Sequence, residues 1–225
     1  ATLKCGFFYI SFMEFLEKEI EKYSLNHTTK ESKLLKSLNR ETWSKVMNPR
    51  MLSGHLQGKI LSMFSNMIKP KNILEIGTYT GYSALCLAEG LQKDGIIHTI
   101  DINEEHIEFA KKYFNRSDYA KNIKLYLGSA LEIIPKLNRN FQLAFIDADK
   151  ENYSKYFDLI IDKIDINGYI IADNVLWSGK VTQEKQDTET KALDLYNKKV
   201  FSDTRIETIL MPIRDGLMIS RKIKK

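Results

Sequence analysis

The sequence has little cysteine and no long hydrophobic run. Its two cysteines, Cys5 and Cys86, lie far apart and match neither a zinc-ligand spacing nor a disulfide framework, as is typical of a reducing compartment. The apolar stretch near the N-terminus is about eight residues long, too short for a membrane span or the core of a signal peptide. No disulfide scaffold or zinc module is indicated, and we expect a cytoplasmic protein that does not enter a membrane.

Charges of both signs are mixed along the chain. Lys and Arg number 34 and Asp and Glu 29, which gives a net charge of +5 without a long basic block. This balance is compatible with RNA binding but does not indicate it. With 225 residues, 43% of them hydrophobic, and no linker-like segment, we expect one domain over residues 1–225. We expect Met13 as the native start, with residues 1–12 non-native or disordered.

The hydrophobic pattern changes near residue 70. Over residues 12–68 apolar positions recur at spacings of three and four, which predicts N-terminal helices. Over residues 70–222 short apolar stretches alternate with longer amphipathic ones, which predicts a mostly parallel sheet with helices on both faces. The predicted strands are 72–77, 96–101, 123–128, 141–147 and 168–174. The predicted helices between and after them are 82–92, 104–114, 130–137, 153–164 and 189–201.

The C-terminal segment departs from this alternation. Two apolar stretches within residues 205–222 are joined by a short loop that contains Pro212 and Asp215-Gly216, which leaves no room for a crossover helix. We therefore expect an antiparallel hairpin at the sheet edge.

Polar residues or glycines lie at the end of each of the five predicted parallel strands. They are Glu75, Asp101, Gly128-Ser129, Asp147 and Asp173-Asn174. In open α/β sheets ligands bind at the carboxyl ends of the strands. Any single acid there is as well explained as a helix cap. Several carboxylates at one edge repel each other, however, unless a cation or a hydroxyl-rich ligand lies between them.

The segment EIGTYTGYS, residues 75–83, predicts a ligand-binding turn. It is not a phosphate-binding loop, because no Lys-Ser/Thr follows, and it is not a dinucleotide fingerprint, because Tyr79 takes the place of the second glycine. Glu75 suits a positively charged amino acid group, and Asp101 can accept both hydroxyls of a ribose. Together these features favour S-adenosylmethionine. Ser129 and Ala130 can hold an adenine edge, although Ser129 is equally well explained as a helix N-cap.

The segment DADK, residues 147–150, and the pair Asp173-Asn174 predict a metal site. Asp147, Asp173 and Asn174 would bring three hard oxygen ligands together, which suits Mg²⁺ with positions left for water and substrate. Lys150 is placed to take a proton from a hydroxyl of the substrate, and Asp149 to hold the amino group of the methionine moiety. Read alone, this segment is also compatible with a solvated, charged helix start.

Three motifs carry a family resemblance: EIGTYTGYS, FIDADKENY and ADNVLWSGKV resemble those of the cation-dependent class I O-methyltransferases, the caffeoyl-CoA and catechol O-methyltransferase group. The resemblance implies a Rossmann-like fold of seven strands, S-adenosylmethionine, a divalent cation (Mg²⁺, with Ca²⁺ or Mn²⁺ as alternatives) and commonly a homodimer. It implies Lys150 as the catalytic base and Trp177 as a wall of the acceptor pocket, although Trp177 is nearly as well explained as a buried anchor. The implied metal ligands are Asp147, Asp173 and Asn174. The implied cofactor-binding positions are Met51, Ser53, Glu75, Gly77, Tyr79, Ser83, Asp101, Ala130, Asp147 and Asp149, with the N-terminal helices acting partly as a lid.

We therefore expect an enzyme that methylates a hydroxyl of a small phenolic vicinal diol. The alternative is a tRNA hydroxyuridine O-methyltransferase of the same family, the only alternative with a nucleic-acid partner. A non-catalytic binding module is disfavoured because the metal trio and Lys150 are all present, and a dehydrogenase because the dinucleotide fingerprint is missing. The N-terminal region shows no pattern that matches a coenzyme A site.

Overall fold

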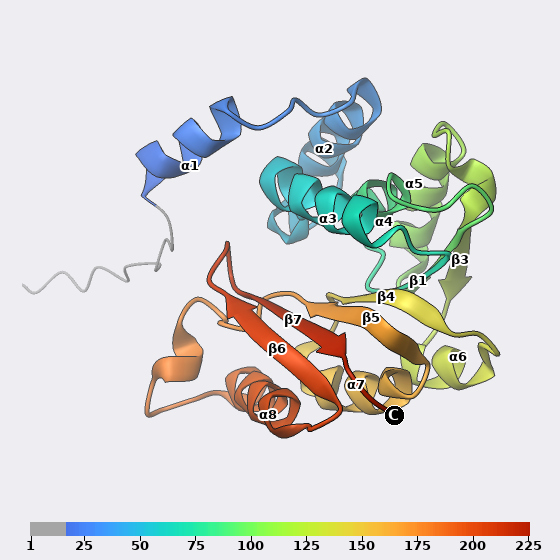
Figure 1. Cartoon of the computed structure of the whole chain (residues 1–225). Helices are drawn as coiled ribbons and strands as arrows, with labels where there is room; N and C mark the ends of the chain where they lie inside the picture. The colour runs from blue at the N-terminus through green and yellow to red at the C-terminus, as the bar shows by residue number, and fades with distance from the viewer. Residues whose placement is uncertain (1–16) are drawn as a thin grey trace, which may run out of the picture.

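The computed structural model describes residues 17–225, so Cys5 and the expected start at Met13 lie outside the described residues. Its centre is one seven-stranded sheet in the order β3-β2-β1-β4-β5-β7-β6 (Figure 1). The strands are β1 Asn72–Ile76, β2 Ile96–Asp101, β3 Ile123–Leu127, β4 Phe141–Ile146, β5 Ile164–Ala172, β6 Ile206–Met211 and β7 Leu217–Lys222. Strands β1 to β5 are parallel, and β7 is antiparallel to both β5 and β6. This confirms the expected sheet and its antiparallel C-terminal pair.

Helices cover both faces of the sheet, as the alternating pattern predicts (Figure 1). One layer is formed by α2 Lys33–Lys45, α3 Gly54–Ile68, α4 Tyr82–Ala88 and α5 Glu104–Phe114, preceded along the chain by α1 Lys18–Asn26. The other is formed by α6 Ala130–Ile133, α7 Tyr153–Ile161 and α8 Thr188–Ser202. Five short 3-10 helices lie in the loops: η1 Pro49–Met51, η2 Ala120–Asn122, η3 Ile134–Lys136, η4 Lys150–Asn152 and η5 Lys180–Thr182.

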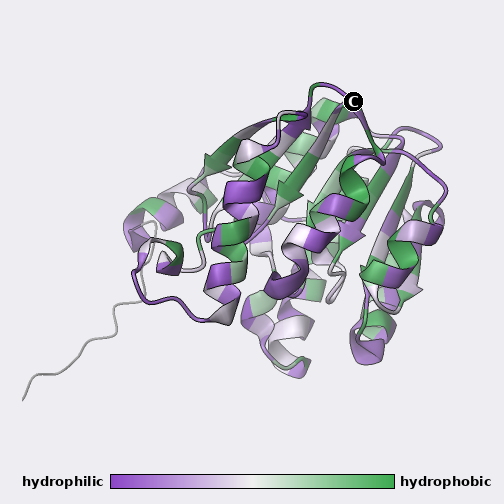
Figure 2. Ribbon diagram, turned by 90° about the horizontal axis from the view of Figure 1, so that it is seen from below, coloured by the Kyte–Doolittle hydropathy of each residue, from purple (hydrophilic) through white to green (hydrophobic). Residues whose placement is uncertain are grey.

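The central strand β4 shows why the sheet is buried on both sides. Ala144 and Ile146 belong to the core under α6 to α8, while Leu143 and Phe145 belong to the core under α2 to α5. Successive side chains of a strand point to opposite faces, so a continuous apolar run places hydrophobic groups in both cores. Figure 2 shows these strands in hydrophobic colours behind helices of alternating hydropathy.

Hydrogen bonds of the parallel ladder continue past the strand ends and align them. The amide of Asp147 donates to the carbonyl of Ile76 at 2.8 Å, and the amide of Asp173 donates to the carbonyl of Ile146 at 2.9 Å. The amide of Gly77 donates to the carbonyl of Ile100 at 2.9 Å in the same way. The polar residues that follow neighbouring strands therefore lie side by side at one edge.

Several predicted boundaries are wrong. The helix expected over 82–92 ends at Ala88. The helix expected over 153–164 ends at Ile161, and β5 starts at Ile164 rather than at 168. The sheet register shifts along this part of β5, and Asn167 has a φ of 65°, so polar residues and Gly168 form an irregular strand start that interrupts the apolar pattern. The helix expected over 130–137 shortens to α6 followed by η3, because Pro135 cannot donate to an α-helical hydrogen bond.

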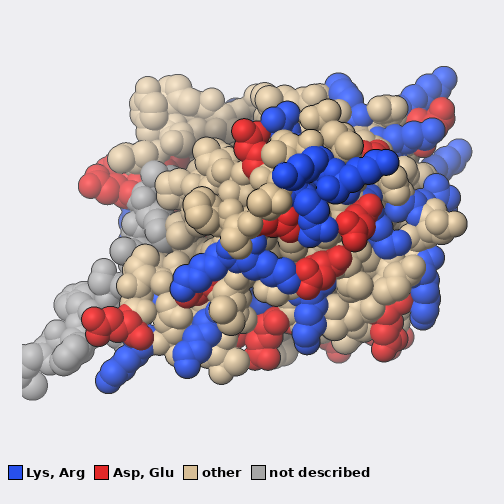
Figure 3. Space-filling model, turned by 60° about the horizontal axis from the view of Figure 1, so that its bottom comes forward, with Lys and Arg blue, Asp and Glu red and all other residues tan. Residues whose placement is uncertain are grey.

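The face that carries α7 and α8 shows basic and acidic side chains next to each other (Figure 3). Lys199 pairs with Asp158 at 2.6 Å, and Arg205 pairs with Asp162 at 3.2 Å. This face therefore lacks the continuous basic patch that RNA backbones favour. Within residues 17–225, no helix is long and apolar enough to cross a membrane.

A single side-chain atom added at Gly77 is expected to disturb the edge of the sheet where the parallel strands end. A Cβ on Gly77 would lie 1.9 Å from the carbonyl oxygen of Asp147, and its φ is +100°. Gly54→Ala is a matched control, because Gly54 also has a positive φ, +72°, but a Cβ there meets nothing within 4 Å. We expect Gly54→Ala to cost about 1–2 kcal/mol of unfolding free energy, and Gly77→Ala on the order of 2 kcal/mol more, in urea denaturation. Equal losses in the two variants would contradict the close approach.

Candidate functional site

A large cavity of about 1220 Å³ lies at the carboxyl edge of the parallel strands. Small-molecule sites have volumes of roughly 300–1,000 Å³, so this cavity has room for two ligands side by side. Of the residues expected at the site, twelve line it: Met51, Gly77, Tyr79, Asp101, Ser129, Ala130, Asp147, Asp149, Lys150, Asp173, Asn174 and Trp177. Ser53, Glu75 and Ser83 do not line it and are buried behind its wall.

Asp101, at the end of β2, is held by donors from two loops. Its carboxylate accepts from the amide of Tyr79 at 2.7 Å and from the amide of Asn103 at 2.9 Å, and His106 lies 3.7 Å away. Burial alone would raise the pKa of Asp101, but hydrogen bonds from His106, Asn103 and Tyr79 outweigh it and hold the pKa below its usual range. Asp101 is therefore a fixed, ionised acceptor on the cavity wall.

Glu75, in β1, is fully buried directly behind the strand edge. Burial, together with the charges of Asp147 and Asp101, raises the pKa of Glu75 to about 8, although the hydroxyls of Ser83 and Thr99 act in the opposite direction. Thr99 donates a hydrogen bond to Oε2. A carboxyl group in such a position favours a positively charged group nearby.

Lys150, the first residue of η4, reaches back between two neighbouring strand ends. Its Nζ lies 3.1 Å from Oδ1 of Asp147 and 2.9 Å from Oδ1 of Asn174. It also donates to the hydroxyl of Tyr153 at 2.8 Å, and that hydroxyl donates to the carbonyl of Asp173 at 3.1 Å. Because the Lys150 side chain is only 9% exposed, its ammonium group is held by these acceptors rather than by solvent.

The oxygens around Lys150 fit a divalent cation. Oδ1 of Asp147 and Oδ1 of Asn174 already lie around one positive charge, the ammonium group of Lys150. Burial and the charge of Asp147 raise the pKa of Asp173 to about 6, so a second cation would relieve crowding between the two carboxylates. Among residues 17–225 no group of three His, Cys, Asp or Glu side chains could hold a metal ion. A metal site here would therefore need the amide oxygen of Asn174 as a ligand.

The loop after β5 is held by the turn between β6 and β7. Leu176 donates its amide to the carbonyl of Asp215 at 2.9 Å, and Val175 donates to that of Gly216 at 3.2 Å. Asn174 and Trp177 in this loop have φ values of 58° and 47°. Such left-handed backbone is uncommon for residues other than glycine, so the loop depends on these contacts for its shape.

Trp177 and Asp149 both line the cavity. The Nζ of Lys150 lies 5.6 Å from the centre of the Trp177 ring, so this ring borders the candidate cation site. Asp149 accepts hydrogen bonds from the hydroxyl of Tyr156 and from the amide group of Asn152. Both donors come from the residues just after Asp149, so its carboxylate is held at the wall.

The N-terminal layer covers one side of the cavity. Met51, at the end of η1, lines it and is 56% exposed. The hydroxyl of Tyr79 donates to the carbonyls of Met47 and Asn48 at 3.3 and 3.2 Å, which ties this segment to the loop after β1. The segment is therefore positioned as a cover over the ligand-binding turn.

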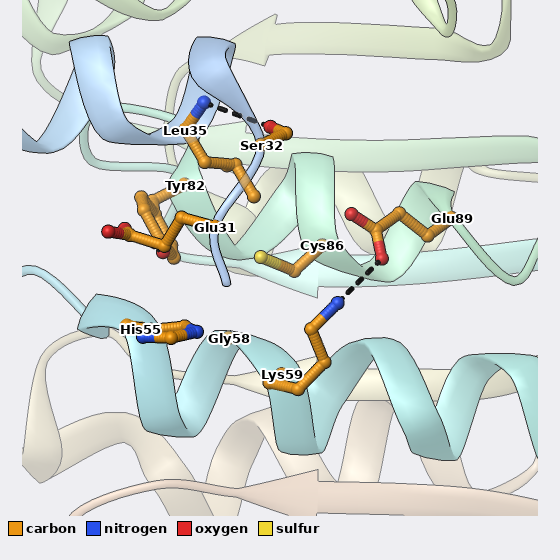
Figure 4. Close-up of a pocket in the computed structure, with 9 residues that line it drawn as sticks. All are labelled: Glu31, Ser32, Leu35, His55, Gly58, Lys59, Tyr82, Cys86 and Glu89. Carbon is orange, nitrogen blue, oxygen red and sulfur yellow. Dashed lines mark hydrogen bonds and ion pairs between the residues drawn. The ribbon is translucent and has the colours of Figure 1, made fainter. Parts of the chain in front are cut away.

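A second, much smaller hollow lies between α2, α3 and α4 (Figure 4). Its volume is about 10 Å³, room for about one water molecule. Cys86 and His55 line it, and Lys59 pairs with Glu89 across 3.6 Å. Burial raises the pKa of the Cys86 thiol well above its usual value, and His55 contacts the carbonyl of Thr29 at 2.8 Å. The hollow carries no ligand site, and His55 is a packing residue.

Sequence reasoning missed several residues of the site. Tyr153 and Tyr156 were given no role at the site. Their helical spacing from the DADK segment places both hydroxyls next to that segment, where they contact Lys150 and Asp149. Gln57 donates from Nε2 to Oδ2 of Asp173 at 2.6 Å, and Arg214 lines the cavity and binds Gln57. No local pattern reveals Gln57, because its partner lies more than a hundred residues away in the chain.

The family model described as O-methyltransferase matches residues 25–223 of this chain. The chain belongs to this O-methyltransferase family. The caffeoyl-CoA O-methyltransferase of Petroselinum crispum is 34% identical over 207 residues, which cover 86% of each chain. That of Mesembryanthemum crystallinum is 36% identical over 180 residues, which cover 74% of this chain and 71% of the relative.

Solved structures share the fold. A Podospora anserina methyltransferase with SAH bound has a TM-score of 0.85 and 26% identity, and covers 99% of each chain. The O-methyltransferase TomG of Streptomyces achromogenes, in complex with SAM, has a TM-score of 0.84 and 24% identity, and covers 91% of this chain and 96% of its own; at that identity it shows the fold alone. The Rossmann-like fold and the enzyme class, an S-adenosylmethionine-dependent O-methyltransferase, are thus confirmed. The metal, the acceptor and the homodimer stay predictions.

The buried carboxyl of this O-methyltransferase predicts a pH dependence of stability. Glu75 has a pKa of about 8 in the folded chain against an ordinary value of 4.5, so the folded state binds the extra proton between these pH values. The stabilising contribution of the protonated Glu75 to the free energy of unfolding is therefore fully present below pH 4.5. It is lost as pH rises toward 8, at up to about 1.4 kcal/mol per pH unit. We expect Glu75→Gln to flatten this slope in urea denaturation from pH 5 to 8.

The control for this pH series is Glu184→Gln, which changes an exposed glutamate and should keep the wild-type slope. A Glu75→Gln protein with the wild-type slope would show that Glu75 does not carry the raised pKa.

Proposed function

We propose that this O-methyltransferase transfers the methyl group of S-adenosylmethionine to a hydroxyl of a small aromatic vicinal diol, with the help of a divalent cation. The observation that carries the proposal is the cluster at the ends of β4 and β5. There the Nζ of Lys150 lies within 3.1 Å of both Asp147 and Asn174, and Asp173 is buried beside them. An amine that could act as a base and three side chains that could supply hard oxygen ligands thus line a cavity with room for two ligands.

The proposed cofactor site is the part of the cavity next to β1, β2 and β3. Asp101 would accept the ribose hydroxyls, because its carboxylate is ionised and fixed by backbone donors. Asp149 would accept the amino group of the methionine moiety, and a positive charge there would favour ionisation of the Glu75 carboxyl, whose pKa burial raises to about 8. Gly77 and Tyr79 would form the turn under the cofactor, with Ser129 and Ala130 at the adenine edge. Met51 and Ser53 would close over the cofactor, and Ser83 would orient Glu75.

Asp147, Asp173 and Asn174 are the proposed ligands of the cation. When bound, a divalent ion lowers the pKa of a coordinated hydroxyl and orients two neighbouring hydroxyls of a diol. Mg²⁺ is proposed first, since it favours oxygen ligands and retains open positions, with Mn²⁺ and Ca²⁺ as alternatives. The buried pair of Asp147 and Asp173 supports a doubly charged ion rather than a neutral ligand.

Lys150 is the proposed general base. Its Nζ donates as an ammonium group to Asp147, Tyr153 and Asn174, so the base would be the neutral amine left after loss of one proton. In that form Nζ would take the proton of the attacking hydroxyl, and the hydroxyl of Tyr153 would hold the amine in place. Trp177 would pack against the aromatic ring of the acceptor and keep its reacting oxygen near Lys150. Positioning of the two reactants in line would supply most of the acceleration.

The alternative acceptor, a hydroxyuridine in tRNA, has less support. The mixed charges on the face that carries α7 and α8 (Figure 3) do not form a backbone-binding surface. The relatives described above are named for caffeoyl-CoA, an aromatic acceptor. We therefore propose a small phenolic substrate and treat tRNA as an outcome of the acceptor assay.

We also propose that the enzyme is a cytoplasmic homodimer. Exposed apolar side chains support a contact between subunits: Met63 and Met67 of α3 are 56% and 75% exposed, and Ile209 of the edge strand β6 is 59% exposed. Analytical ultracentrifugation at micromolar concentration tests the dimer.

Removal of divalent ions is expected to abolish methyl transfer. Labelled S-adenosylmethionine would be offered with a simple catechol, a flavonoid, caffeoyl-CoA and bulk tRNA, each with and without EDTA. We expect label in a catechol-type acceptor, its loss with EDTA, and recovery after addition of Mg²⁺, because the hydroxyl is activated at the cation. Activity that is indifferent to EDTA would contradict the metal role. If label appears only in tRNA, and less of it is transferred as the salt concentration rises, then tRNA and not a phenolic diol is the acceptor.

Substitution of the base is expected to lower turnover with little effect on cofactor affinity. Lys150→Ala should reduce kcat by roughly 10² to 10⁴, because the proton of the acceptor hydroxyl loses its recipient. Lys222→Ala is the control: Lys222 is also buried, but its Nζ donates to the carbonyls of Ile161 and Ile164 at the other end of the sheet. A Lys150→Ala enzyme within a few-fold of wild-type turnover would exclude this residue as the base.

A further inference from the structure

Arg214 links the last hairpin of the chain to the N-terminal helical layer. It lies in the turn between β6 and β7 with a φ of 52°, a backbone conformation uncommon outside glycine. Its Nη1 donates to the carbonyl of Ser53 and to Oε1 of Gln57 at the start of α3. One side chain thus joins two segments that are about 160 residues apart in the sequence.

This contact decides the orientation of the Gln57 amide. A guanidinium group has only donors, so Arg214 can bind only the amide oxygen of Gln57. The NH₂ group must then point the other way, where it donates to Oδ2 of Asp173 at 2.6 Å. Gln57 is 1% exposed, so no solvent is available to replace either bond. Without Arg214 the amide would be free to rotate, and its oxygen would repel the carboxylate.

The chain of contacts ends on the carboxylate of Asp173. Oδ1 of Asp173 accepts from the amide of Asn174 at 2.8 Å, and Oδ2 accepts from Gln57. One fixed donor on each oxygen sets the plane of the carboxylate and leaves further lone pairs unused. Partners that orient a metal ligand in this way typically change metal affinity by about 10–100-fold when they are removed.

We propose that Gln57 and Arg214 are positioning residues for the divalent cation. Arg214 fixes the amide of Gln57, and Gln57 fixes the plane of the Asp173 carboxylate, which would be a ligand of the ion. This inference depends on the metal site of the proposed function and extends it to two residues from opposite ends of the chain. Because Arg214 also binds the carbonyl of Ser53, the same contact holds the start of α3 against the hairpin.

The test measures Mn²⁺ binding by the free-ion EPR signal, on the full chain with S-adenosylhomocysteine present. We expect Gln57→Leu to weaken Mn²⁺ binding about 10–100-fold. Arg214→Ala should weaken it in the same direction, and Arg214→Lys should recover part of the loss because an ammonium group is also a pure donor. The double variant should bind Mn²⁺ no more weakly than Gln57→Leu, since both residues act through one hydrogen bond to Asp173.

Two controls separate positioning from general damage. Gln142→Leu removes another glutamine that donates to an aspartate, Asp165, far from the cavity, and should leave Mn²⁺ binding unchanged. Saturating Mg²⁺ should return kcat of Gln57→Leu toward the wild-type value, which a damaged fold would not allow. Thermal unfolding in EDTA identifies any variant that fails to fold, and the Arg214→Ala and Arg214→Lys pair then carries the test, because Arg214 is only half-buried.

The outcomes distinguish this inference from the proposed function. If wild type does not bind Mn²⁺, or Asp173→Asn binds it equally well, the metal site and the inference both fail. If wild type binds, Asp173→Asn does not, and Gln57→Leu or Arg214→Ala stays within two-fold of wild type, only the inference is overturned.

Discussion

The close approach of the β1 and β4 ends sets the geometry of the whole site. Gly77 lies against the carbonyl of Asp147, where no side chain fits, and the ladder continues with the amide of Asp147 on the carbonyl of Ile76. The same ladder places Asp173 beside Ile146 on the next strand. Because neighbouring strands are about 4.8 Å apart, side chains that follow them can share one cation or one ligand. The polar cluster is thus a consequence of sheet register.

Electrostatics then makes the site selective for positive partners. Burial raises the pKa of Glu75 and of Asp173, and Asp147 adds its charge to both. Lys150 directly contacts Asp147, while Arg214 lines the cavity and is linked to Asp173 through Gln57. A methyl donor that carries a sulfonium and an ammonium group, and a divalent ion, would supply the missing positive charge. Glu75 is held by the hydroxyl of Thr99, and Asp173 by the amide of Asn174 and the side chain of Gln57, so these carboxyl groups keep their positions at the strand ends.

Much of this could be predicted from the sequence, because strand ends in a parallel sheet must meet at one edge. The apolar runs predicted the strands, and the polar residues after them predicted most of the cavity wall. What failed was local: Asp165, Asn167 and Gly168 concealed the start of β5, and Pro135 ended α6 early. Ser53 and Ser83 were expected at the cofactor from the family resemblance, and Glu75 also from the turn that it opens; the structure buries all three behind the cavity wall. Periodicity predicts which face a residue occupies but not its depth below a surface.

The position of the hairpin explains why Gln57 and Arg214 escaped sequence reasoning. An antiparallel hairpin was expected at the edge, but its strand order was not. Since β7 inserts between β5 and β6, β6 runs parallel to β5, and the turn after β6 lies at the same edge as the ends of β4 and β5. Had the order been reversed, β6 would run antiparallel to β5 and the turn would lie at the opposite edge. One choice of strand order therefore brings Arg214 to the candidate metal site, where the C-terminal hairpin and the N-terminal helices act on the same carboxylate.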